Sequence, residues 1–324
     1  MNFKQYKLSA IVFVLTFILL GFVQLKLERP MILAERFLKG GGWIEIILIS
    51  AYGAFVINKM RTPVNVPRWR KITWTTFSIV FFTQLLIGLA GFDKFLMTGK
   101  LHLPVPMMIL AGPIYRGQLS VMTILFLSIV ILTGPAWCSQ LCYFGAFDNL
   151  ASGGKTSKEI LKYKTAIKST ILMLVIAVAI LLRWMNVGML VSTLIAVAFG
   201  LGGIVVMILI SLKKKKMVHC TMYCPIGTLV SIIKHVNPFR LYIEQSCTLC
   251  MNCTKFCKYD ALNPVDIKNS KPALSCTLCG DCLAGCHHNF IRYKFLNMKP
   301  EYARNLYLVL TISLHAACIG LARI

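Results

Sequence analysis

Long uncharged runs separated by short polar segments are the dominant pattern along the chain. The clearest run extends from Leu8 to Leu25, preceded by Lys4 and Lys7. Runs of this length are typical of helices that cross a bilayer. The pattern predicts six spans: residues 8–25, 43–58, 72–92, 118–137, 165–182 and 186–212. A last apolar run, Asn305–Ala322, predicts either a seventh span or an interfacial helix, because His315 lies in its middle.

Composition and charge support a membrane protein. Hydrophobic residues make up 57% of the chain and charged residues only 14%, whereas soluble domains have about 25% charged residues. The net charge of +24 lies mainly in short loops between apolar runs, as the positive-inside rule describes, and does not indicate nucleic-acid binding. Alternating the spans places the N-terminus and all cysteine motifs on the cytoplasmic side of a bacterial or archaeal inner membrane. We expect anionic lipid at that face.

The segment Asp93–Arg116 interrupts the pattern of spans. It contains Pro104, Pro106 and Pro113, which would break a helix repeatedly. Irregular backbone at this apolarity must be shielded by protein or line a cavity, so a re-entrant or interfacial loop on the outer face is predicted. Its polar candidates for a ligand such as a quinone are His102, Tyr115 and Arg116. The alternative is an interfacial loop with solvated charges.

Two cysteine runs carry the strongest chemical signal. CTLCMNCTKFC and CTLCGDCLAGC share the spacing C-x2-C-x2-C-x3-C, which in bacterial-type ferredoxins holds two 4Fe-4S clusters, the fourth cysteine of each run ligating the other cluster. That rule gives two ligand sets: Cys247, Cys250, Cys253 and Cys286 for cluster one, and Cys276, Cys279, Cys282 and Cys257 for cluster two. Disulfides would need an oxidising compartment. Zinc ribbons use separate CxxC pairs, without the third and fourth cysteines that follow each pair here.

A second pair of motifs indicates an internal repeat. Cys138-x3-Cys142 and Cys220-x3-Cys224 each follow a long apolar run, and each is followed three residues later by glycine, Gly145 or Gly227. If the motifs are helical, each presents two thiols in one direction, and two such ends could hold a third cluster or a soft metal. The alternatives are simple packing of buried cysteines and a thiol–disulfide switch. His219 could tune such a site.

These observations predict an all-α polytopic membrane protein of six or seven helices with a small cytoplasmic ferredoxin-like domain. The predicted domains are a membrane domain at 1–241, a domain with two 4Fe-4S clusters at 242–297, and a C-terminal membrane or interfacial helix at 298–324. The middle domain is short and rich in cysteine, so its clusters rather than a hydrophobic core would hold it together.

The combination of two C-x3-C motifs and a doubled ferredoxin run resembles the polyferredoxin-like membrane proteins of the NapH, NosR and CcoG group, with NapH-type proteins the closest likeness. The resemblance covers roughly residues 120–293. It implies a membrane subunit that relays electrons between a quinone pool or cytosolic donor and a partner. The chain departs from the group where Tyr143 follows Cys142, where Lys258 follows Cys257 and where His287 follows Cys286, since proline is usual at these positions.

The expected function is therefore electron transfer within a larger redox complex. The sequence contains no phosphate loop, nucleophile–base pair or CxxCH haem motif, so an independent catalytic site is not identified and enzyme status stays open. Other redox subunits in the membrane are expected partners, and the mildly basic segment 242–297 would suit an acidic soluble ferredoxin or flavodoxin. The alternative is an assembly factor that reduces a metal or disulfide during maturation of another membrane complex.

Overall fold

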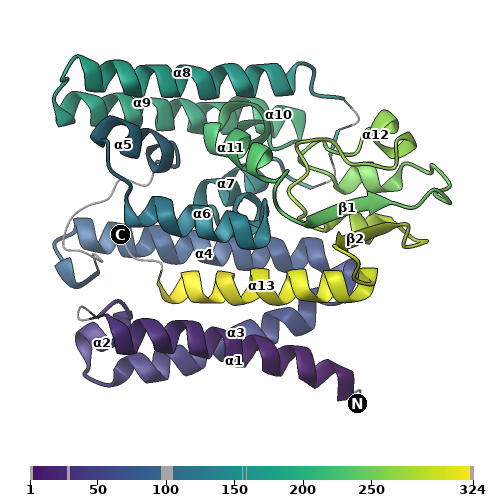
Figure 1. The fold of residues 1–324 in the computed structure, drawn as a ribbon, viewed down its shortest axis with the longest axis horizontal. Helices are drawn as coiled ribbons and strands as arrows, with labels where there is room; N and C mark the ends of the chain where they lie inside the picture. The colour runs from purple at the N-terminus through teal and green to yellow at the C-terminus, as the bar shows by residue number, and fades with distance from the viewer. Residues whose placement is uncertain (1–2, 28–29, 96–104, 155, 158, 322–324) are drawn as a thin grey trace. The chain divides into compact units, whose positions relative to one another are not determined.

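The chain forms a largely helical protein with one antiparallel pair of strands in the part that the structure describes (Figure 1). The computed structural model describes residues 3–27, 30–95, 105–154, 156–157 and 159–321. Contacts divide the chain into one unit of Met1–Leu103 with Glu301–Ile324 and a second unit of Pro104–Pro300. The predicted boundaries at residues 242 and 298 stay predictions, because this division by contacts follows a different criterion.

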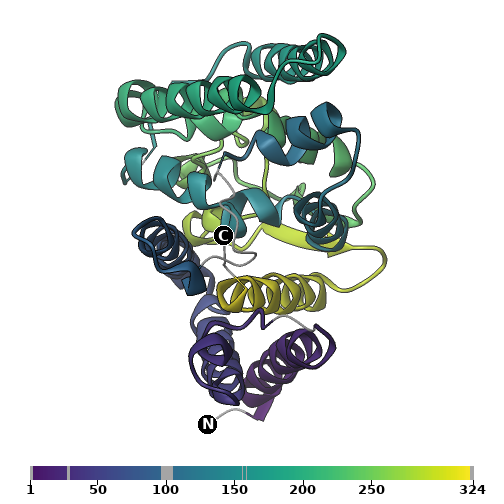
Figure 2. The same cartoon turned by 90° about the vertical axis from the view of Figure 1, so that its left-hand side faces the viewer.

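The first unit is a group of apolar helices. Its elements are α1 (Phe3–Lys26), α2 (Leu33–Phe37), α3 (Gly41–Met60), η1 (Pro63–Asn65), α4 (Val66–Leu89), η2 (Asp93–Phe95) and α13 (Pro300–Gly320). Helices α1 and α3 pack along each other (Figures 1 and 2). Val12, Val56 and Ile312 are buried in their shared core with α13. A Cβ at Gly53 would lie 3.1 Å from Val12 Cγ1, so the missing side chain permits this close approach.

Helix α13 carries its central histidine in a satisfied environment. His315 is buried, and its Nε2 lies 3.1 Å from the hydroxyl of Tyr52 on α3. A buried polar side chain costs little once it is hydrogen-bonded. The histidine therefore does not prevent this apolar segment from forming one continuous helix, which is among the described helices long and apolar enough to cross a membrane.

The second unit contains every cysteine motif. Its helical elements are α5 (Met108–Arg116), α6 (Val121–Thr133), η3 (Trp137–Leu141), α7 (Tyr143–Ala151), α8 (Lys164–Trp184), α9 (Met189–Val206), η4 (Met207–Ser211), α10 (Leu212–Lys214), η5 (His219–Tyr223), α11 (Pro225–Ile233), η6 (Asn252–Phe256), α12 (Pro264–Lys268) and η7 (Asp281–Gly285). The strands β1 (Phe239–Ile243) and β2 (Ile291–Phe295) pair antiparallel, with Leu241 opposite Tyr293.

Six helices within the described residues are long and apolar enough to cross a membrane, consistent with a multi-pass membrane protein. Their ranges are Tyr6–Lys26, Gly41–Met60, Pro63–Leu89, Lys164–Trp184, Met189–Lys214 and Pro300–Gly320. Five of these match predicted spans, and the sixth is the last apolar run, for which the sequence left two alternatives. The all-α polytopic fold is thus confirmed. The predicted span at 118–137 is too long, because α6 ends at Thr133, where Gly134 has a φ of 62° and Pro135 follows.

The proline-containing segment is more regular than predicted. Residues Met108–Arg116 form helix α5 with Pro113 inside it, and the Tyr115 hydroxyl donates to the carbonyl of Val187 at 2.6 Å. Pro113 removes one amide donor, but nine residues still form a short helix that ends at Gly117 in the left-handed region. His102 lies outside the described residues. The idea of a quinone ligand at Tyr115 and Arg116 stays a prediction.

The cysteine runs lie at one end of the second unit, beside β1, β2 and α12 (Figure 1). Each strand turns one face inward, so that Leu241, Ile243, Ile291 and Tyr293 are buried. The two short helices η6 and η7 pack against each other, and each carries the third cysteine of its run. The repeated spacing in sequence therefore becomes a repeated structure around a small core.

Candidate functional site

The two C-x3-C motifs adopt the same local structure. Each lies in a single wide turn, η3 or η5, closed by an i+5 hydrogen bond: Cys142 N–H donates to Trp137 O at 2.9 Å, and Cys224 N–H to His219 O at 2.8 Å. Such π-turns are rare and occur frequently at functional sites. Cys142 and Cys224 then have nearly equal backbone angles, with φ of −76° and −73° and ψ of 113° and 117°. The predicted internal repeat is visible in the backbone.

The second cysteine of each motif precedes a nine-residue helix, α7 or α11. The backbone N–H groups of Phe144 and Gly145 point at the Cys142 thiol. Those of Ile226 and Gly227 point at Cys224 in the same way. Amides at a helix N-terminus stabilise a thiolate, which is the form that binds metals. The glycines three residues after each pair thus donate to sulfur.

The four thiols of Cys138, Cys142, Cys220 and Cys224, here named the helix-end group, lie close enough to influence one another. Burial is the main cause that raises the thiol pKa in each case, to about 12 for Cys142, and neighbouring thiols raise it further at Cys138, Cys142 and Cys220. Four buried thiolates would repel one another strongly without a compensating positive charge. The group therefore suits a cationic metal centre that binds thiolates.

The number and placement of ligands differ between a single metal ion and a 4Fe-4S cube. Among the described residues, no three His, Cys, Asp or Glu side chains are placed to hold one metal ion. The ligands of a 4Fe-4S cube bind different iron atoms and are therefore spread around a larger body. The helix-end group has four cysteines, which is the number of ligands that such a cube takes.

Three polar residues surround the helix-end group. Asp148 of α7 is fully buried and accepts a hydrogen bond from Cys220 N–H at 2.9 Å, and burial raises its pKa to about 6. Lys168 of α8 is also buried, lines a small cavity with Cys138 and Cys220, and donates to the Ser231 hydroxyl at 2.9 Å. His219 is buried and packs against the rings of Phe144 and Tyr223, so it is part of the core.

The ferredoxin-type runs bring their cysteines together in the two predicted sets. Group one, defined as Cys247, Cys250, Cys253 and Cys286, lines one small cavity, and group two, defined as Cys257, Cys276, Cys279 and Cys282, lines another. Burial raises the thiol pKa of Cys253, and the nearby thiols of Cys286, Cys247 and Cys250 raise it further. Burial also raises the thiol pKa of Cys257, and Cys279 and Cys276 of the other run raise it further. The crossover of the fourth cysteine is thus present in the geometry.

The backbone of the two runs wraps around these cavities in the same way. Leu249 and Met251 have φ of 55° and 57°, and the corresponding residues of the second run, Leu278 and Gly280, have 56° and 82°. Three of these four are not glycine, and left-handed residues of this kind persist where the surroundings determine them. The N–H groups of Ala261 and Phe290 donate to Cys257 Sγ and Cys286 Sγ, each at 3.2 Å.

Direct hydrogen bonds join group two to the helix-end group. The hydroxyl of Tyr259, two residues after Cys257, donates to the carbonyl of Cys138 at 2.8 Å. The hydroxyl of Ser139 donates to the carbonyl of Thr277 at 3.3 Å. One cavity is lined by Cys138, Cys220 and Cys276 together with Tyr259 and Thr277. The two thiol groups therefore share a boundary made of single residues.

A buried ion network holds the same two regions together. Asp260 has a fully buried carboxylate that pairs with Lys164, at 3.0 Å, and with Lys216. It also accepts a hydrogen bond from Leu161 N–H at 3.1 Å. Lys258 adds contacts to the carbonyls of Asn149 at 2.9 Å and Gly153 at 2.6 Å. Lys216 therefore has a structural role in the fold through its pair with Asp260.

Sequence reasoning did not identify Tyr259, Asp260 or Asp148 as site residues. The chain has only 11 acidic residues, so an acid six positions after Cys142 was a signal that could have been followed. For Tyr259 and Asp260, proximity to Cys257 was the only available sign. Their partners lie far away in the sequence, and only the fold brings them together.

Comparison with known proteins gives one family match. The family model described as "4Fe-4S binding domain" matches residues 117–160 and 193–237, which are the two segments around the C-x3-C motifs. No curated protein and no solved structure matches this chain. The match covers well under half of the chain. It places an iron–sulfur signature on the paired helix ends and, with the apolar helices, supports an iron–sulfur membrane protein.

Proposed function

We propose that this protein is a membrane-bound electron-transfer subunit that relays electrons through three 4Fe-4S clusters. Group one and group two would each bind one cluster, as the doubled ferredoxin run predicts. The helix-end group would bind the third. Support comes from the four converging buried thiols and from the family match at these segments. Each cluster would accept and donate one electron at a time, and the chain would supply the ligands and their spacing.

The observation that carries this proposal is the direct connection between group two and the helix-end group. The Tyr259 hydroxyl donates to the carbonyl of Cys138, and the Ser139 hydroxyl donates to the carbonyl of Thr277. Short, bonded separations of this kind favour electron exchange between neighbouring centres. The arrangement supports an order of centres from group one through group two to the helix-end group.

Exposure suggests where electrons enter this order. Cys250 of group one is exposed, whereas Cys282 of group two and Cys138 of the helix-end group are buried. We propose that a cytosolic donor, such as an acidic ferredoxin or flavodoxin, meets group one, and that a redox subunit in the membrane meets the other end. The positive-inside distribution of loop charges supports the cytoplasmic side for group one. Resemblance to NapH-type proteins supports the same assignment.

Iron and acid-labile sulfide analysis with paramagnetic resonance, on anaerobically purified protein, tests the third cluster. We expect roughly twelve irons per chain, four for each of three cubes. A Cys138→Ser, Cys220→Ser double variant should fall to roughly eight irons. A Cys318→Ser variant is the matched control, because Cys318 belongs to α13 and to none of the three groups.

The result that overturns the third cluster is roughly eight irons in both wild type and double variant. Far-ultraviolet circular dichroism of each variant separates loss of a cluster from loss of the fold. A wild type with no iron at all would overturn the relay itself.

A further inference from the structure

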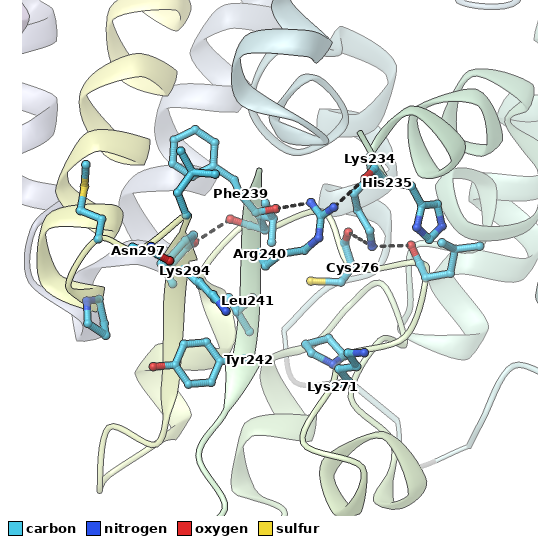
Figure 3. A pocket seen from close by; sticks show the side chains of 17 residues that line it. Lys234, His235, Phe239, Arg240, Leu241, Tyr242, Lys271, Cys276, Lys294 and Asn297 are labelled. Carbon is cyan, nitrogen blue, oxygen red and sulfur yellow. Dashed lines mark hydrogen bonds between the residues drawn. The ribbon is translucent and has the colours of Figure 1, made fainter. Parts of the chain in front are cut away.

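A large cavity adjoins group two, because Cys276 is part of its lining. It has a volume of about 990 Å³ and is lined by the two residues after α11, both strands, the loop at 271–278 and the segment after β2 (Figure 3). Sites for small molecules usually measure about 300–1,000 Å³ and are mostly apolar with a few polar groups. Leu241, Leu278 and Tyr293 form part of an apolar lining that also includes Cys276. The size and composition match a binding site.

The charges on this lining all have one sign. Lys234, Arg240, Lys271 and Lys294 line the cavity together with His235, and no acidic residue lines it as far as the structure describes it. Lys234 is fixed by the carbonyls of Leu274 and Cys276, at 2.9 and 3.1 Å, as Figure 3 shows. The exposed side chains of Lys271 and Lys294 have no hydrogen bond or ion pair to a described residue. Two cationic tips are therefore available to a ligand.

Crowding of these cations disfavours the empty cavity. Arg240 lies directly opposite Lys294 in the register of β1 and β2, and like charges placed opposite each other destabilise a strand pair. A bound anion would offset this repulsion.

We propose that this cavity binds an amphiphilic phosphate-type anion, with its head at Lys271 and Lys294 and its apolar body against Leu278 and Cys276. Because Cys276 belongs to group two, the bound negative charge would make reduction of that cluster less favourable and lower its reduction potential. This second statement rests on the proposed function, whereas binding itself does not. A phosphorylated nucleotide cofactor and an anionic phospholipid share this chemistry.

Titration of the full-length protein with two probes tests the binding. Flavin mononucleotide is followed by its fluorescence, and monomeric dihexanoylphosphatidylglycerol is tested directly by calorimetry and as a competitor. A Lys271→Gln, Lys294→Gln variant should bind the preferred probe about tenfold more weakly, since two charge-assisted contacts are lost. The matched control is Lys268→Gln, Lys299→Gln, which removes the same charge from exposed lysines outside the cavity. It should change affinity less than about twofold.

Uncharged versions of the probes show whether the anion is needed. Riboflavin and a dihexanoyl diacylglycerol should bind much more weakly than their phosphorylated forms. Tighter binding of the flavin probe assigns the nucleotide class, and tighter binding of the lipid probe assigns the phospholipid class. The inference is overturned if neither probe binds saturably, or if both double variants lose the same affinity.

A redox titration by paramagnetic resonance, with and without the bound probe, tests the effect on group two. We expect a shift to lower potential that is absent in the Lys271→Gln, Lys294→Gln variant. Iron-loaded protein that binds neither probe contradicts this inference and leaves the relay intact. Protein without iron contradicts the relay, and the binding titration still decides whether the cavity takes an anion.

Discussion

At Gly227, one missing side chain determines the spacing between the two cysteines of a motif. A Cβ at this position would lie 2.8 Å from the backbone carbonyl oxygen of Cys220. Backbone atoms cannot move aside as a flexible side chain can, so the Cys220–Cys224 turn would have to shift. The glycine therefore contributes both an amide donor to Cys224 and the space for Cys220.

We expect Gly227→Ala to weaken the third centre selectively. Overpacking of this kind typically costs about 1–3 kcal/mol, and here the shift falls directly on a proposed ligand. Iron content should drop from roughly twelve toward roughly eight per chain while groups one and two keep their clusters. Gly154→Ala is the matched control, because nothing lies within 4 Å of a Cβ there. Full iron content in Gly227→Ala would contradict this role.

Asp260 gives a second prediction at the scale of single residues. Asp260→Asn leaves Lys216 buried with a lost carboxylate partner, and breaking a buried ion pair typically costs about 3–5 kcal/mol. Urea unfolding, followed by cluster absorbance and circular dichroism, should show a clearly lower midpoint. Glu159→Gln removes an acid from the exposed pair with Lys214 and should change the midpoint little. Equal effects of the two variants would show that the buried ion pairs of Asp260 stabilise the fold no more than the exposed pair does.

At the scale of elements, α2 and α3 are joined by a capping interaction. The Glu35 carboxylate accepts hydrogen bonds from Gly40 N–H, at 3.0 and 3.1 Å, and from Gly42 N–H at 3.0 Å. These amides begin α3 and have no partner within the helix. They lower the pKa of Glu35, the Gly40 bond being the largest cause.

The lowered pKa gives this junction a defined pH dependence. The ionised carboxylate stabilises the fold above its unfolded pKa, near 4.5, and this contribution is lost as the pH falls through the lowered folded value. Glu35→Gln should therefore lower the thermal unfolding midpoint at pH 7, and its difference from wild type should shrink below pH 4.5. A difference that does not change with pH would exclude this carboxylate as the cause.

Elements also show what could and could not be predicted from the sequence. Uncharged runs predicted five of the candidate spans because length and apolarity are local properties. The run at 118–137 forms a shorter helix than predicted, because Gly134 and Pro135 end α6. The cysteine spacing predicted the two sets of thiols that the fold brings together. The contacts of Lys164 and Lys216 with Asp260 could not be predicted, because these lysines lie 96 and 44 positions away from it in the sequence.

At the scale of the whole molecule, the bond between Tyr259 and Cys138 should control the rate of electron flow. Tyr259→Phe removes the hydroxyl donor but keeps the ring, so all clusters should remain. We expect slower oxidation of the group-two centre by the helix-end centre, measured by freeze-quench paramagnetic resonance after rapid reduction. Tyr242→Phe is the control, since the Tyr242 hydroxyl has no hydrogen bond among the described residues. An unchanged rate in Tyr259→Phe would show that electrons take another path.

The buried ion network around Asp260 has a consequence for how such a protein could operate. A carrier domain on a flexible tether must diffuse between its donor and acceptor, so its turnover slows as the solvent becomes more viscous. Here the segment that carries the ferredoxin-type runs is fixed by buried charges to the start of α8 and to the residues just after α10. The segment is therefore held in one position and does not move between a donor and an acceptor. The rate of electron transfer within the protein should not depend on solvent viscosity. Viscosity should slow only the diffusion of donors and acceptors to it.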